Sequence, residues 1–265
     1  MWRFWILNNW LFLKGREKDL CLFLWFFQVM RYQSVDLLRW IAVIFMAVFH
    51  FYFMSTSFFH WESFQGYQTV FFWVGRSAAL LFLLISGLAF WLSYEKKSFS
   101  LKQYYRRAWQ IFLAAFLITL GSYFFSPERT VWFGILHFFA LSFILLPWVV
   151  RLPSLLISAL VFGCLMTGVY LTGKTFFVSV LFLPLGFRWA SFQSFDYYPL
   201  LPWFGYVLIG YLIAVFLKSH NLVEKLLGWR YPRLGWLARV GERSLWIYLL
   251  HIPLIYGLLW LLDFF

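Results

Sequence analysis

The sequence predicts an all-α protein: a polytopic transmembrane helix bundle of about seven spans plus one re-entrant or interfacial segment. Hydrophobic residues make up 63% of the 265 residues, mean hydropathy is +0.77, and charged residues account for only 12%. A soluble domain carries about twice that share of charge. The apolar residues also gather into runs near the ~20 residues that cross a bilayer, which leaves no stretch for a separate soluble domain.

The first 30 residues are treated as an N-terminal extension. They hold two apolar runs, 1–13 and 20–30, separated by the charged stretch 14–19, and neither run reaches a full span. They fit either an amphipathic anchor at the membrane interface or an upstream extension with Met30 as the natural start. The transmembrane domain is then expected over residues 31–265.

Seven apolar segments in the remaining chain are long enough to be predicted as spans. They cover approximately residues 36–54, 69–94, 108–125, 133–150, 154–172, 200–217 and 244–262. The apolar part of 173–199 is too short to cross comfortably and is broken by Pro184 and Gly186, which favours a re-entrant or interfacial segment.

Loop charges predict the orientation. Lys and Arg gather in 95–107 and 218–243, whereas 55–68 has neither and 126–132 has only Arg129. The positive-inside rule then puts the N-terminus in the cytoplasm and the C-terminus outside. The same rule explains the net charge of +12, so nucleic acid is not expected as a partner and the lipid bilayer is.

The first span carries an ionisable stripe. Asp36 and Arg39 are three residues apart and share a helix face, and His50 follows Arg39 by eleven residues, about three turns or 16 Å along the same face. Ionisable groups at membrane depth are costly and usually face a bundle interior or a watery cavity. This stripe is the strongest indication of function in the residues themselves.

Further polar residues at or near span depth form the remaining candidate site. They are His60, Arg76, His137, Asp196, Tyr248 and His251. Simpler explanations exist for each: a solvated loop histidine, an interfacial side chain, or hydrogen-bonding contacts between helices. No Cys/His metal constellation and no Gly-rich phosphate loop is present, so no metal is expected.

Five blocks, in order, resemble a known family. They read S-V-D-L-L-R-W-I-A-V-I-F-M-A-V-F-H, G-R-S-A-A-L-L-F-L-L-I-S-G-L-A-F-W-L-S-Y, F-G-I-L-H-F-F-A-L-S, D-Y-Y-P-L-L-P-W-F-G-Y-V-L-I-G and L-A-R-V-G-E-R-S-L-W-I-Y-L-L-H. Over about residues 31–262 they are similar to bacterial relatives of heparan-α-glucosaminide N-acetyltransferase. The Arg39-to-His50 spacing also resembles the first-span motif of the broader membrane acyltransferase-three family. Residue 40 is Trp where both families usually have Gly.

The resemblance implies acyl transfer across a bacterial inner membrane. Cytosolic acetyl-CoA would be the acyl donor, an amino sugar or cell-envelope glycan outside would be the acceptor, and a homodimer is suggested. In the namesake enzyme the catalytic His lies in the external loop, at the position of His60 here, and an active-site Asn lies at the position of His50. Which imidazole is the base is left open.

The residues fit that chemistry independently. An imidazole suits proton transfer near neutral pH, either as a base or as a transient acyl carrier. Candidate cations for the CoA phosphates are Arg39, Arg106, Arg107, Arg239 and Arg243. Asp36, Arg39, Arg76, His137, Asp196, Tyr248 and His251 are the candidate substrate-binding residues, with Tyr248 or Arg76 as oxyanion donors. A transporter or channel lined by the polar stripe is the main alternative, and a non-catalytic membrane scaffold is the third.

Overall fold

The structure is a computed structural model that describes residues 32–64, 66–95, 99–229 and 244–264. Within these ranges the chain is helical and contains no β-strand. The all-α prediction is therefore confirmed, and the physical reason is simple. In hydrocarbon a lone segment can satisfy its backbone N–H and C=O groups internally only as a helix. The proposed extension, residues 1–30, lies outside the described part of the chain.

Eight α-helices and three short 3₁₀ helices follow one another along the described residues. The α-helices are α2 (Gln33–Ser57), α3 (Gln68–Tyr94), α4 (Leu101–Phe125), α5 (Ile135–Val149), α6 (Ser154–Leu171), α7 (Leu200–Ser219), α8 (Val223–Leu227) and α10 (Ser244–Phe264); the 3₁₀ helices are η2 (Glu62–Phe64), η3 (Pro127–Arg129) and η4 (Val180–Leu185).

Each of the seven expected spans corresponds to a helix. Six of them are long and apolar enough to cross a membrane, which makes the chain a multi-pass membrane protein. The remaining helix, α5, which corresponds to the expected span 133–150, has only 15 residues and is shorter than expected. The segment expected to be re-entrant or interfacial contains no span: its one regular element is the six-residue η4.

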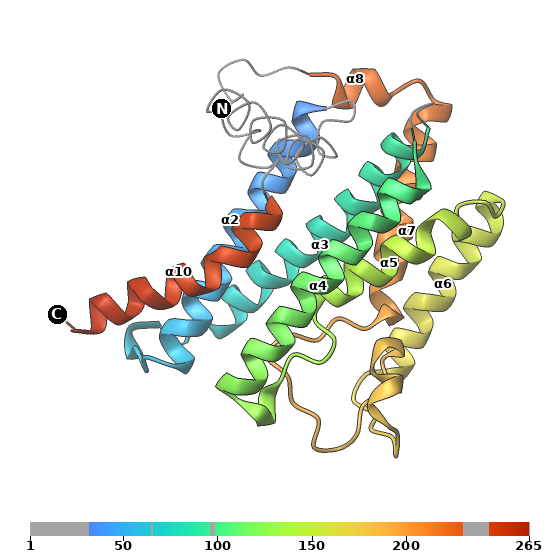
Figure 1. Cartoon of the computed structure of the whole chain (residues 1–265). Coiled ribbons are helices and arrows are strands. Elements are labelled where there is room, and N and C mark those ends of the chain that lie inside the picture. The colour runs from blue at the N-terminus through green and yellow to red at the C-terminus, as the bar shows by residue number, and fades with distance from the viewer. Residues whose placement is uncertain (1–31, 65, 96–98, 230–243, 265) are drawn as a thin grey trace, which may run out of the picture.

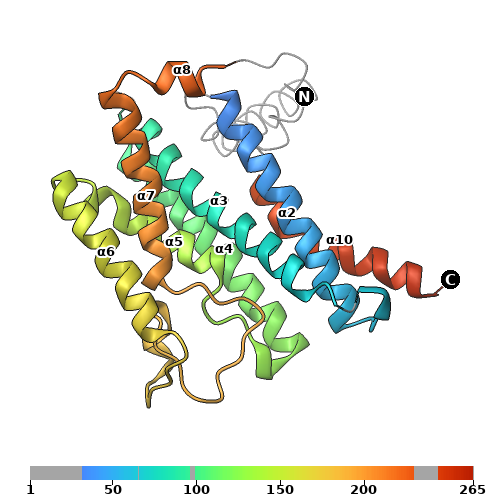
Figure 2. The same cartoon turned by 180° about the vertical axis from the view of Figure 1, so that it is seen from behind.

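The spans alternate in direction, and this creates two distinct ends of the bundle (Figures 1 and 2). Three helices begin at the α8 end, namely α2, α4 and α6, and three finish there, namely α3, α5 and α7, whereas α10 begins partway along α2 (Figure 1). At the loop end lie residues 58–67, 126–134 and 172–199, together with the end of α10. The described parts of the two basic segments, 99–107 and 218–229, lie at the α8 end.

The central contact of the bundle joins α3 to α7. A Cβ atom at Gly210 would overlap the backbone carbonyl of Leu84, and a Cβ at Gly87 would overlap that of Val207. Small residues at these two points let the helix backbones touch, which is how membrane helices gain packing energy without a hydrophobic driving force. Large side chains such as Leu83 and Leu208 are fully buried on either side.

The other helices are arranged around this pair. α6 packs on α7, where Gly168 lies directly against Pro202, and α4 pairs with α5. α2 packs on the other flank of α3, and α10 lies along α2 (Figures 1 and 2). Consequently the first and last helices of the described chain are neighbours, although the rest of the bundle separates them in sequence.

Two hydrogen bonds attach α8 to the start of α2. The Tyr32 hydroxyl donates to Glu224 Oε1 at 2.6 Å, and Ser34 Oγ donates to the Leu227 carbonyl at 2.7 Å. Burial and the Glu224 carboxylate raise the pKa of Tyr32 to about 12, so this hydroxyl keeps its proton at physiological pH. The contact fixes where the first span begins.

The Gly210→Ala substitution should destabilise the protein. The added methyl group must push α7 away from the Leu84 carbonyl, and overpacking of this kind typically costs about 1–3 kcal/mol. Gly163→Ala in α6 is the matched control, because a Cβ there meets nothing within 4 Å and alanine favours helix. Thermal unfolding in detergent should show a lower midpoint for Gly210→Ala alone; equal midpoints for the two variants would contradict the assigned role of Gly210.

Candidate functional site

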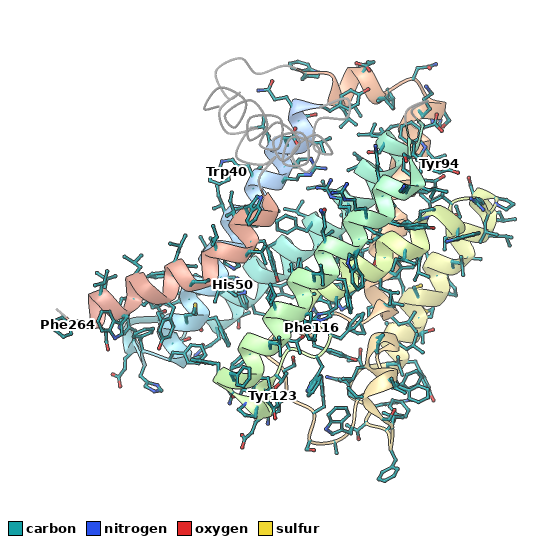
Figure 3. All side chains as sticks on the ribbon, viewed as in Figure 1. Trp40, His50, Tyr94, Phe116, Tyr123 and Phe264 are labelled. Atoms are coloured by element: carbon teal, nitrogen blue, oxygen red, sulfur yellow. The ribbon has the colours of Figure 1, made fainter. Side chains whose placement is uncertain are left out.

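Two imidazoles meet between the first and last spans. His251 Nε2 in α10 lies 3.2 Å from His50 Nδ1 in α2, and the ring centroids are 4.7 Å apart in an edge-to-face arrangement. His251 is buried, with 5% of its surface exposed, and His50 is half-buried. Figure 3 labels His50 near the crossing of α2 and α10. The structure thus brings together two predicted site residues that are 201 positions apart.

Backbone carbonyls determine which ring nitrogens carry protons. His50 Nδ1 is 2.9 Å from the Met46 carbonyl, and His251 Nδ1 is 2.6 Å from the Tyr248 carbonyl. A carbonyl oxygen can only accept, so both Nδ1 atoms must be N–H donors. In the neutral pair His251 Nε2 is then unprotonated and accepts a second bond from His50 Nδ1–H. This leaves the Nε2 atom of His50 as a proton acceptor.

Further polar side chains lie beside this pair. The Tyr248 and His251 rings are 5.4 Å apart, and Asp196 and Tyr198 lie close enough to Tyr248 to interact with it electrostatically. Arg76 in turn lies close to Tyr198. Five predicted site residues, from His50 to Arg76, therefore belong to one neighbourhood that is drawn from α2, α3, α10 and the segment before α7.

Arg76 is held by aromatic rings. Its guanidinium carbon lies 4.6 Å from the ring centroid of Trp203, which is buried, and 5.6 Å from that of Phe72. Stacking of this kind compensates a cation for lost water and leaves the guanidinium edge available for hydrogen bonds. The side chain is exposed to the surroundings, so this cation can reach a ligand.

Asp196 anchors the loop end to the start of α5. Its Oδ2 atom accepts the backbone N–H of Ile135 at 2.8 Å, in the first turn of that helix. Gly134 makes room for the carboxylate, since a Cβ there would overlap it. Burial raises the pKa of the Asp196 carboxyl from 3.8 to about 6, although the hydrogen bond from Ile135 acts in the opposite direction.

His137 has protein partners for both ring nitrogens. Gly134 N–H donates to Nδ1 at 3.3 Å, so the proton belongs on Nε2, which lies 3.3 Å from Thr119 Oγ1. Thr119 Oγ1 in turn donates to the Val131 carbonyl at 2.6 Å. These bonds describe a helix cap that ties α5 to α4. Substrate binding by His137 stays a prediction, and it would have to break one of these bonds.

The other predicted catalytic residue, His60, lies in a separate cavity at the loop end. This cavity of about 480 Å³ is lined by Tyr52, Thr56, Ser57, His60, Trp61, Glu62 and Gln68. His60 is exposed and has φ = 55°, a left-handed conformation that non-glycine residues seldom adopt and that often occurs at functional sites. His50 lies seven residues before the end of α2, about 10 Å deeper along the helix.

Cations gather at the α8 end. Asp36 and Arg39 form the predicted ion pair, and both side chains are largely buried. Arg107 in α4 is buried, with 7% exposed, and lies close enough to Arg39 to interact with it, whereas Arg106 is exposed. Arg239 and Arg243 lie outside the described residues. Two guanidinium groups from α2 and α4 thus approach each other, an arrangement suited to a multiply charged anion.

Sequence reasoning missed the pairing inside this site. It placed His50 with Asp36 and Arg39, and His251 with Tyr248, but it did not predict that the two imidazoles touch. It also missed Trp203 as the platform for Arg76. No signal in a single sequence reports which face of α10 meets α2, because both helices are apolar on most sides. Across the described residues, no three His, Cys, Asp or Glu side chains gather as a metal site.

The Asp196→Asn variant should change how stability depends on pH. Because the pKa of Asp196 is raised in the folded state, its protonated form favours folding below about pH 4, and this contribution is lost as pH rises through about 6. A shift of this size corresponds to at most roughly 3 kcal/mol. Thermal midpoints from pH 4 to 7 should therefore fall more steeply for the native protein than for Asp196→Asn, with Gln193→Ala as the control. Parallel curves would contradict the burial of this carboxyl.

Comparison with known proteins supplies the family. The family model described as heparan-alpha-glucosaminide N-acetyltransferase, catalytic, matches residues 31–253, which is most of the chain. The matched region includes α2 through α8 and the first half of α10, and therefore His50, His60, Arg76, Asp196 and His251. No curated protein and no solved structure matches the chain. This multi-pass membrane protein belongs to the family of heparan-alpha-glucosaminide N-acetyltransferase catalytic domains.

Proposed function

We propose that the protein is a membrane acetyltransferase that takes an acetyl group from acetyl-CoA at the α8 end and delivers it to an amino sugar or cell-envelope glycan at the loop end. The observation that carries the proposal is the His50–His251 pair, which lies within the spans between a cationic end and an open cavity. In a chain of an acetyltransferase family, a half-buried imidazole with one acceptor nitrogen is the natural proton-transfer group.

The α8 end fits an acyl-CoA donor. Arg39 and Arg107 supply two neighbouring guanidinium groups for phosphate oxygens, and Asp36 keeps Arg39 in place. Arg39 precedes His50 by eleven residues, about 16 Å along α2. An extended thioester arm that is bound by its phosphates at Arg39 would reach toward the imidazole pair. When bound, acetyl-CoA supplies an activated acetyl group, whose transfer to an amine forms a C–N bond, breaks the C–S bond and releases the CoA thiol.

His50 has the right atom for the proton step. Its Nε2 accepts the proton that the attacking amine loses, while Nδ1–H stays bonded to the Met46 carbonyl and to His251 Nε2. Both acceptors stabilise the imidazolium that forms, because hydrogen bonds to the charged form favour it. The same proton then passes to the departing sulfur. Arg76 and the Tyr248 hydroxyl are the proposed donors for the developing oxyanion.

The cavity at the loop end fits the acceptor. The half-buried Trp61 offers an aromatic side chain to a sugar ring, and the exposed Glu62 offers a carboxylate to an ammonium group. The volume of about 480 Å³ is that of an ordinary small-ligand site. We assign His60 to acceptor binding here, although the resemblance points to it as the base, because it lies exposed at the end of α2 rather than at the imidazole pair.

The proposed orientation follows from the loop charges. The α8 end, with the N-terminus, would be cytoplasmic, and the loop end, with the C-terminus, would be outside a bacterial inner membrane. A homodimer remains a prediction from the family resemblance. The transporter alternative would give substrate flux into liposomes without any acyl donor, whereas the acetyltransferase would give acetylated acceptor only when acetyl-CoA is present on the α8 side.

Replacing the two histidines one at a time tests their roles. His50→Ala should lower kcat about 100-fold or more, because a general base usually contributes a rate factor of this size. His60→Ala should mainly raise the KM for the acceptor. Steady-state acetyl transfer in proteoliposomes gives both constants. The reverse pattern would move the base to His60, and full activity in both variants would remove the imidazoles from the mechanism.

Donor binding predicts a stability change that does not depend on turnover. Coenzyme A at about 100 times its Kd should stabilise the folded protein by about 2.7 kcal/mol, and Arg107→Gln should lose most of this gain. Arg129→Gln at the loop end is the control, since that exposed guanidinium lies at the opposite end of the bundle. Thermal unfolding with and without coenzyme A is the measurement. An equal shift in both variants would reject the proposed donor end.

A further inference from the structure

The contact between His251 and His50 has a specific chemical consequence. We propose that His251 is a positioning residue: it fixes the ring orientation of His50 and, together with the Met46 carbonyl, its tautomer, so that Nε2 of His50 is presented as the proton acceptor. This inference rests on the proposed function of His50. It extends that function by assigning a role to the last span, which otherwise contributes little buried surface to the bundle.

The hydrogen-bond chain runs in one direction only. The Tyr248 carbonyl must accept, so His251 Nδ1 donates to it at 2.6 Å and His251 Nε2 is left as an acceptor. That acceptor lies 3.2 Å from His50 Nδ1, whose proton the Met46 carbonyl also accepts at 2.9 Å. The Tyr248 carbonyl thus sets the tautomer of His251, whereas the tautomer of His50 is held by two acceptors of its Nδ1–H, the Met46 carbonyl and His251 Nε2. The logic is that of an oriented catalytic histidine, in which a second group holds the ring for its task.

The last span is built to hold this contact. α10 lies against α2 and the loop that follows it, and it is attached at three levels. His251 contacts His50, the Tyr256 ring lies 5.4 Å from Phe59, and Asp263 Oδ1 accepts Trp61 Nε1–H at 3.4 Å. Much of the remaining surface of α10 is exposed, as at Leu254. These contacts hold α10 against α2 and its exit loop along most of its length, and they keep His251 beside His50.

Other titratable groups near the pair are few in the described chain. On α10 the Tyr248 ring faces His251, and across from it Asp196 and Tyr198 interact with Tyr248. From α2 only His50 itself faces His251. A proton gained at His50 is therefore stabilised locally by His251 Nε2 and the Met46 carbonyl. Removing His251 should alter both the tautomer balance and the proton affinity of His50.

The test compares three substitutions. His251→Leu removes the acceptor, and His251→Gln keeps an amide oxygen that can still accept from His50 Nδ1–H. Leu254→Ala is the matched control, because it changes an exposed side chain of the same helix without touching the imidazoles. Each protein is measured by the pH dependence of kcat and kcat/KM, by the KM for acetyl-CoA, and by ¹⁵N NMR of labelled histidine in the absence of substrate.

The proposal expects His251→Leu to lower kcat about 100-fold with little change in the KM for acetyl-CoA, and to shift the acidic limb of the pH profile. The His50 ¹⁵N signals should change from a single Nδ1–H tautomer to a mixture. His251→Gln should restore part of both, and Leu254→Ala should resemble the native protein. In a His50→Ala background, His251→Leu should cause no further loss of kcat, because the two residues act as one unit.

An unchanged pH profile together with an unchanged His50 tautomer in His251→Leu would overturn the proposal, as would losses that simply add in the double variant. If His251→Leu fails to fold, His251→Gln is measured in the same way. Because an amide cannot fully reproduce the imidazole geometry, an unchanged pH profile together with an unchanged His50 tautomer in His251→Gln would then overturn the proposal. Failure of the proposed function gives a different result: the native protein then shows no acetyl transfer, while the NMR measurement still reports whether His251 fixes the tautomer of His50.

Discussion

The absence of water in the bilayer core is the constraint on which this structure depends. Each backbone must be helical, and each polar side chain at depth needs a partner within the protein. Six long apolar helices and the shorter α5 meet the first requirement. The second draws the few polar groups of several helices into shared contacts, such as His50 with His251 and Asp36 with Arg39. What looks like a set of scattered ionisable residues in the sequence becomes a small number of interior clusters.

These clusters lie at three levels along the bundle. The α8 end carries the guanidinium groups of Arg39 and Arg107, the middle carries the imidazole pair, and the loop end carries the cavity with His60 and Glu62. The tight α3–α7 contact at Gly87 and Gly210 is the rigid support beside them. α2 connects all three regions, because Arg39, His50 and the residues leading to His60 follow one another on a single helix and its exit loop.

Much of this arrangement could be predicted from the sequence, for identifiable reasons. Long apolar runs report spans directly, and three-residue spacing reports the Asp36–Arg39 pair, because both follow from local helix geometry. The contact between His50 and His251 could not be predicted, because it depends on how two apolar helices rotate against each other. The same limit applies to Arg76 on Trp203, where the ring comes from another helix. For His137, the spacing gave no hint that Gly134 and Thr119 engage both ring nitrogens.

The shortness of α5 has a consequence for the distance that an acyl group must travel. Its 15 residues extend about 22 Å, less than the ~30 Å hydrocarbon thickness of a typical bilayer. Asp196 joins the segment that precedes α7 to the first turn of this short helix. Hydrophobic mismatch of this kind thins the adjacent lipid or admits solvent. Under the proposed function, thinner lipid beside α5 would shorten the distance that the acetyl group must cross.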